Sequence, residues 1–178
     1  FVVIVKVVNL AADKPTHPYV RGIVGGSLVG LIAMALPLTV GAGNTQLTAV
    51  IDNAATISTW LLVAVLVGKM LAMALSLATG FIGGNVLPML FVGGTAGVIA
   101  HQLFPSIPYA IAVGCMLSAV PGATIRAPLG LTAIAALSVG LGPVTTAPVA
   151  AAVVTAHVVT AAVVRLVRAR TPLPVVHA

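Results

Sequence analysis

The side chains that could do chemistry in this 178-residue chain are few and far apart. Asp13 and Asp52 are its only carboxylates, and they are not paired at helical spacing. The four histidines are dispersed, with no HxxxH pattern and no cysteine partner, so we expect no metal site. The residue types therefore predict neither an enzyme nor a bound cofactor.

Backbone groups are better candidates for a binding site than these side chains. They occur in the stretch GFIGGNVLPMLFVGG, which starts at Gly80. Gly83 and Gly84 permit backbone angles and close approaches that a side chain would obstruct, and a helix is predicted to open at Asn85 and Val86. The first N–H groups of a helix lack intrahelical partners and carry a partial positive charge, so they attract anions. The residues themselves leave two interpretations equally open: an anion-binding site, or a glycine-rich turn that serves only packing.

The scarcity of acids favours an anion over a cation. No acidic residue follows Asp52. Cation pathways generally use carboxylates or rings of carbonyls, and proton pumps use acids within the membrane. A helix dipole binds an anion without a full positive charge, so the ion can also leave, as conduction requires.

The helices that flank the stretch starting at Gly80 are predicted to lie in a membrane. Hydrophobic residues make up 60% of the chain and charged residues 6%, which cannot cover a soluble surface. The apolar runs have helical length and lack the alternation of a barrel, so we predict an all-α polytopic membrane protein. The net charge of +6 comes from scattered residues and a final cluster of Arg165, Arg168 and Arg170. This cluster predicts a cytoplasmic C-terminus, and we expect no nucleic-acid partner.

The apolar runs also predict where the helices lie. The expected segments are 19–36, 45–55, 58–79, 86–103, 108–120, 126–139 and 143–167. Segment 58–79 is the clearest spanning candidate, whereas several others are shorter than the ~20 residues that cross a bilayer. Short helices interrupted by Gly and Pro are typical of transporters and channels, in which helix ends lie inside the membrane.

Four isolated residues that are basic or contain sulfur have roles that the sequence partly predicts. Lys69 either bonds backbone carbonyls or lends positive potential to a pathway, and the sequence leaves both open. His157 fits a buried histidine with one hydrogen bond better than a proton relay. Arg126 fits an interfacial anchor better than an anion attractor, and Cys115 fits a small buried core residue.

Three motifs, taken in order, resemble those of the CLC family of chloride channels and chloride/proton antiporters. They are LPLTVGAGN, GGNVLPMLFVGGTAGVIAHQLFP (similar to the segment with the GxFxP motif) and ATIRAPLGLTAIA (similar to SIRAPLTG). The resemblance covers residues 19–174. It implies transport of chloride-like anions by a fold of two inverted repeats with broken, tilted and re-entrant helices. It also implies a homodimer whose interface includes segments 126–139 and 143–167.

The resemblance implies the site residues as well. The anion ligands would be the backbone N–H groups of Asn85 and Val86, with Gly83 and Gly84 shaping the turn. Val86 stands where the family usually has Phe. Pro174 stands where the family has the tyrosine whose hydroxyl contributes to an inner site, so that hydroxyl is replaced.

The matched motifs belong to the second repeat alone. We interpret residues 1–18 as the end of a preceding helix and a loop, 19–167 as the second repeat, and 168–178 as a short cytoplasmic segment. The GSGIP-like and GREGP-like motifs of the first repeat do not occur in the chain, so we expect an N-terminal repeat to be required. The expected location is a bacterial-type plasma (inner) membrane.

Two other hypotheses stay open at this point. The first is an inverted-repeat secondary transporter for a substrate other than a halide. The second is a degenerate or accessory membrane subunit that only packs against partners. The sequence does not decide between a channel and a proton-coupled antiporter.

Overall fold

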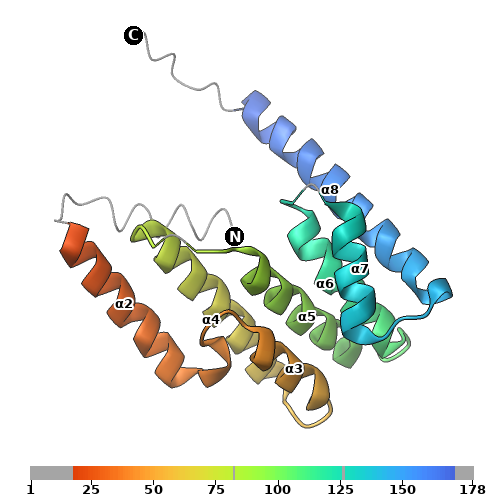
Figure 1. Cartoon of the computed structure of the whole chain (residues 1–178), viewed down its shortest axis with the longest axis horizontal. Helices are drawn as coiled ribbons and strands as arrows, with labels where there is room; N and C mark the ends of the chain where they lie inside the picture. The colour runs from red at the N-terminus through yellow and green to blue at the C-terminus, as the bar shows by residue number, and fades with distance from the viewer. Residues whose placement is uncertain (1–17, 82, 126, 171–178) are drawn as a thin grey trace.

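The computed structural model of the chain describes residues 18–170, except 82 and 126 (Figure 1). The described part is helical, with no strand. Its elements are α2 (Pro18–Ala35), the 3-10 turn η1 (Pro37–Thr39), α3 (Asn44–Asp52), α4 (Thr59–Ala78), α5 (Val86–Leu103), α6 (Tyr109–Gly122), α7 (Pro128–Val139) and α8 (Pro143–Arg170). The predicted all-α fold is confirmed.

Most helix bounds follow local signals in the sequence. Ser58 lies before α4, and its hydroxyl oxygen accepts a hydrogen bond from the Leu61 N–H at 3.4 Å. This is the capping that a serine at the start of a helix provides. The bounds of α5 agree with the predicted segment 86–103.

Two helices run further than predicted. The sequence predicts an end at Val120, but α6 continues through Pro121 to Gly122. Pro121 has no N–H to donate, so it removes one intrahelical hydrogen bond, and the helix ends one residue beyond it. Similarly, α8 continues from Val167 to Arg170, because Arg and Ala are good helix formers.

The helices differ in their ability to cross a bilayer. Three are long and apolar enough to span one: Thr59–Ala78, Val86–Leu103 and Pro143–Val167. Three apolar helices are shorter: Tyr19–Ala35, Tyr109–Gly122 and Pro128–Val139. The predicted mixture of long and short apolar helices is therefore confirmed, and the chain is an integral membrane protein.

Helix α5 is at the centre of the packing. It contacts α3, α4 and α6, while α6 also contacts α7 and α8, and α2 packs on α4 and η1. Figure 1 shows α2, α4 and α5 side by side, with α3 near one end of them. One apolar cluster contains Phe91 and Val98, and a second contains Leu90, so α5 contributes to both. The start of α5 is thus held by the helices on either side.

The contact between α5 and α6 is close enough to bring backbones together. A Cβ added to Gly93 would lie 2.5 Å from the Met116 carbonyl oxygen, and one added to Gly97 would lie 2.5 Å from the Val113 Cα. Small residues permit this approach, which stabilises helix pairs in lipid.

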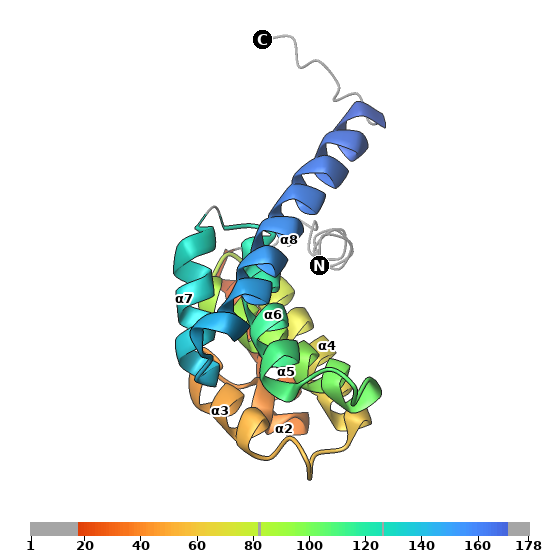
Figure 2. The ribbon, with the colours of Figure 1, turned by 90° about the vertical axis from the view of Figure 1, so that its right-hand side faces the viewer.

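Helices α7 and α8 present apolar side chains outward. Leu129, Leu137 and Val144 are 84%, 84% and 87% exposed. Figure 2 shows the second half of α8 extending beyond the other helices. This apolar surface is suited to lipid or to another protein.

Candidate functional site

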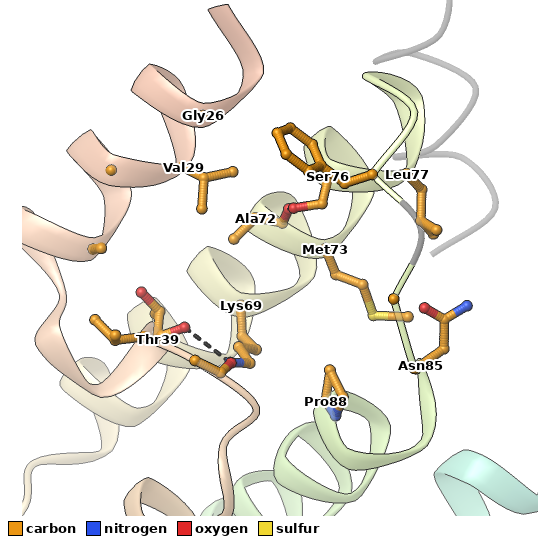
Figure 3. A pocket seen from close by; sticks show the side chains of 17 residues that line it. Gly26, Val29, Thr39, Lys69, Ala72, Met73, Ser76, Leu77, Asn85 and Pro88 are labelled. Carbon is orange, nitrogen blue, oxygen red and sulfur yellow. Dashed lines mark hydrogen bonds between the residues drawn. The ribbon is translucent and has the colours of Figure 1, made fainter. Parts of the chain in front are cut away.

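A cavity of about 560 Å³ lies between α2, α4, the turn that follows η1, and the start of α5 (Figure 3). Its α2 wall includes Gly26 and Gly30, where an added Cβ would meet nothing within 4 Å. Its α4 wall includes Lys69 and Ser76. The Ser76 hydroxyl donates to the Ala72 carbonyl at 2.9 Å, so that hydroxyl proton is already engaged.

Three of the four predicted anion-binding residues line this cavity. Gly83, Gly84 and Asn85 form the wall just before α5. Val86, the first residue of α5, is not among the lining residues, and its side chain is 41% exposed. Pro174 lies outside the described residues.

The start of α5 leaves backbone donors available. Asn85 occupies the cap position, and its side chain makes no capping hydrogen bond. The Met89 N–H donates to the Asn85 carbonyl at 3.1 Å, which closes the first turn. Pro88 has no N–H, and the N–H groups before it have no partner inside the helix. The cavity wall therefore lies beside the positive end of the α5 dipole.

The glycines before α5 differ in backbone conformation and surroundings. The left-handed turn is made by Gly80, with φ +89°. An added Cβ at Gly83 or Gly84 would meet nothing within 4 Å. The protein therefore leaves open space beside Gly83 and Gly84, and the prediction that a side chain there would obstruct an approaching anion stays a prediction.

Lys69 is buried on the α4 wall. Its Nζ donates to the Thr39 carbonyl at 2.9 Å and to the Gly41 carbonyl at 2.6 Å (Figure 3). It also lies 5.4 Å from the centroid of the Phe91 ring. Of the two interpretations, the bonding of carbonyls is confirmed. Lys69 thereby ties α4 to the turn that leads into α3.

His157 and Cys115 are not among the residues that line this cavity. His157 Nδ1 is 3.2 Å from the Gly122 carbonyl oxygen, which confirms a histidine with one hydrogen bond. Cys115 is half-buried beside the Leu90 cluster, and Arg126 lies outside the described residues.

Sequence reasoning missed the α2 wall and the residue that secures α2 against α4. Arg21 Nη2 donates to the Ala78 carbonyl at 2.6 Å, at the end of α4. A Cβ added to Gly25 would collide with the Thr79 side chain, so α2 and α4 touch there. A glycine in a helix of a membrane protein is a signal for such contact, and in segment 19–36 Gly25 is the one that makes it.

A second cavity, of about 440 Å³, lies at the other end of α5. It is lined by Asp52, His101, Gln102 and Tyr109, among others. The Tyr109 hydroxyl donates to the Ile51 carbonyl at 2.9 Å. The described carboxylate of this chain therefore lies with a histidine and a tyrosine, apart from Lys69.

Known proteins similar to this chain identify its family. The profile described as voltage gated chloride channel matches residues 1–161. Proteins named "Putative ion-transport protein YfeO" from Escherichia coli (strain SMS-3-5) and Escherichia fergusonii are each 33% identical over 96 residues. The match covers 53% of this chain but only 22% of the length of each relative. No solved structure matches. This chain belongs to the voltage gated chloride channel family, the CLC family whose motifs it resembles.

Proposed function

We propose that this chain takes part in transmembrane transport of chloride-like anions, with the anion held by backbone amides at the N-terminus of α5. The observation that carries the proposal is the cavity bordered by Gly83, Gly84 and Asn85, directly before that helix. Family membership and the relatives named for ion transport support the general class.

The chemistry of such a site is weak and reversible. The N–H groups of Asn85 and Val86 donate to the anion, and a hydrogen bond to a charged group contributes about 1.5–3 kcal/mol. The positive end of the helix dipole adds about half an elementary charge. These contributions offset part of the lost hydration without trapping the ion. Because the ligand is the amide, a Val in place of Phe at position 86 keeps the donor.

The surrounding architecture follows from the same proposal. Residues 19–167 form the second inverted repeat, and a first repeat supplies the rest of each pathway. Two copies pair, with α7 and α8 at the interface, which their exposed apolar side chains support. The arginines near the end of α8 support a cytoplasmic side for that end, in a bacterial-type plasma membrane.

Chloride efflux from liposomes tests the transport class. The protein expressed from the whole reading frame that contains this chain is reconstituted with internal KCl, and chloride release is followed after addition of valinomycin. We expect release above that of protein-free liposomes, and its dependence on a proton ionophore separates an antiporter from a channel. An absence of flux for chloride, bromide and nitrate would overturn the proposal and favour a non-halide transporter or an accessory subunit.

Anomalous scattering from bromide tests the binding mode separately. In crystals grown with bromide, we expect a peak within hydrogen-bond distance of the Asn85 and Val86 amides. If chloride efflux persists but bromide binds elsewhere in the chain, the amide site is refuted while anion transport stands.

A further inference from the structure

Lys69 carries a buried charge that its protein contacts do not balance. Its side chain is 3% exposed, and both of its described hydrogen-bond acceptors, Thr39 and Gly41, are neutral carbonyls. An ammonium has three N–H donors, so one donor and the net charge remain. The Phe91 ring contributes only a weak cation–π attraction. A buried charge without a counter-ion is strongly unfavourable.

Acidic side chains do not supply that counter-ion in the described part of the chain. Asp52 is the one carboxylate there, and it lines the other cavity beside His101 and Tyr109. An anion that enters the cavity beside Lys69 would supply the balancing charge that the described residues lack.

The cavity brings the lysine to the same space as the start of α5. Lys69 lines it from α4, while Gly84 and Asn85 line it from the segment before α5. Figure 3 shows Lys69 directed toward the Thr39 turn on one side, with Asn85 and Pro88 on the other. An ammonium and a helix N-terminus are both electropositive, so they favour a negative species between them.

We propose that Lys69 is the charged part of the anion site, and that an anion bound between its ammonium and the N-terminus of α5 is its counter-ion. The inference rests on the proposed function, since it adds a second group to the same site. It assigns Lys69 two roles: two of its donors hold the turn, and its remaining donor and charge serve the anion.

Substitutions at position 69 separate these two roles. Lys69→Gln keeps an N–H donor for the carbonyls but removes the charge, whereas Lys69→Arg keeps both. Arg21→Gln is the matched control, because it also removes one positive charge beside α4 but does not line the cavity. We expect Lys69→Gln to raise the half-saturating chloride concentration of efflux by about tenfold or more, the loss of one hydrogen bond to a charged group. Lys69→Arg and Arg21→Gln should stay within about twofold.

The outcomes distinguish this inference from the proposed function. If the unmodified protein passes chloride and Lys69→Gln does so with unchanged chloride dependence, the inference is overturned and transport stands. If the unmodified protein passes no chloride, chloride-dependent thermal stabilisation in detergent decides. A stabilisation that Lys69→Gln abolishes and Arg21→Gln retains supports the inference, and the absence of any stabilisation overturns it.

A measurement on the unmodified protein covers the case in which Lys69→Gln does not fold. In bromide-containing crystals, an anomalous peak within hydrogen-bond distance of Lys69 Nζ supports the inference. A peak at the α5 amides without contact to Lys69 overturns it.

Discussion

Two glycine pairs within one short stretch of this chain have opposite surroundings. A Cβ added to Gly83 or Gly84 would meet nothing within 4 Å, and both residues border the cavity before α5. A Cβ added to Gly93 would lie 2.5 Å from a backbone oxygen of α6, and one added to Gly94 would collide with the Leu47 side chain. The first pair leaves space open, while the second pair lets neighbouring helices fill it.

The comparison shows that the role of a glycine depends on whether another helix packs against it. The second pair lies inside α5, between α3 and α6, where close packing is what holds helices together in lipid. The first pair lies before the helix, where the N–H groups need open access if they are to bind a ligand. The tightly packed part of α5 and the open cavity before its first residue are thus close together in the chain. We call the packed part, around Gly93 and Gly94, the frame.

The largest expected effect comes from filling the packed side. In Gly97→Val the new Cβ would meet the Val113 Cα at 2.5 Å, and in Gly93→Ala it would meet the Met116 carbonyl oxygen. Backbone atoms cannot move aside as a side-chain end can, so we expect each variant to lose about 3 kcal/mol of stability or to fail to fold. Thermal unfolding in detergent and the monodisperse fraction in size-exclusion chromatography measure this. Unfolding midpoints equal to that of the unmodified protein would show that α5 and α6 are not in backbone contact.

A smaller and different effect is expected on the open side. Gly84→Ala places a methyl group in empty space, so stability should change by no more than about 0.5 kcal/mol. The same methyl group enters the space before the α5 amides, and chloride efflux should fall by about tenfold. Liposome efflux and thermal unfolding are measured on the same preparation.

A glycine that neither packs nor lines the cavity provides the control for that experiment. An added Cβ at Gly22 meets nothing within 4 Å, and Gly22 is not among the lining residues. Gly22→Ala should raise stability by up to about 1 kcal/mol through helix propensity and leave efflux unchanged. Unchanged efflux in Gly84→Ala as well would mean that the open pair borders no transport site.

The helix boundaries that the sequence predicts correctly are marked by residues at or next to those boundaries. The start of α5 is marked by Asn85 and Pro88 and its end by a Phe-Pro pair, and α4 begins after the capping Ser58. Such signals act within a few residues, so they are readable without knowing what packs where. The end of α6 is less readable, because the helix continues one residue past Pro121.

The parts that could not be predicted depend on segments far apart in the sequence. Gly84 and Gly93 look alike in the chain, and only the approach of α6 distinguishes them. The acceptors of Lys69 lie 30 and 28 residues away, in a turn whose position depends on α2 packing against α4. Periodicity carries no information about such a pairing. For this reason the sequence left the role of Lys69 open, although it named Gly83, Gly84 and Asn85.

The smallest expected effect tests whether the packed side is only a frame. Thr95 follows the second glycine pair and is fully buried, and its hydroxyl oxygen has no hydrogen-bond partner among the described residues. Thr95→Val keeps the shape and removes this unsatisfied group, so we expect stability to rise by about 1 kcal/mol and efflux to stay unchanged. A loss of stability would show that the hydroxyl has a partner, such as a buried water. A loss of efflux with stability retained would mean that the packed half of α5 also takes part in transport, and the separation between frame and site would no longer hold.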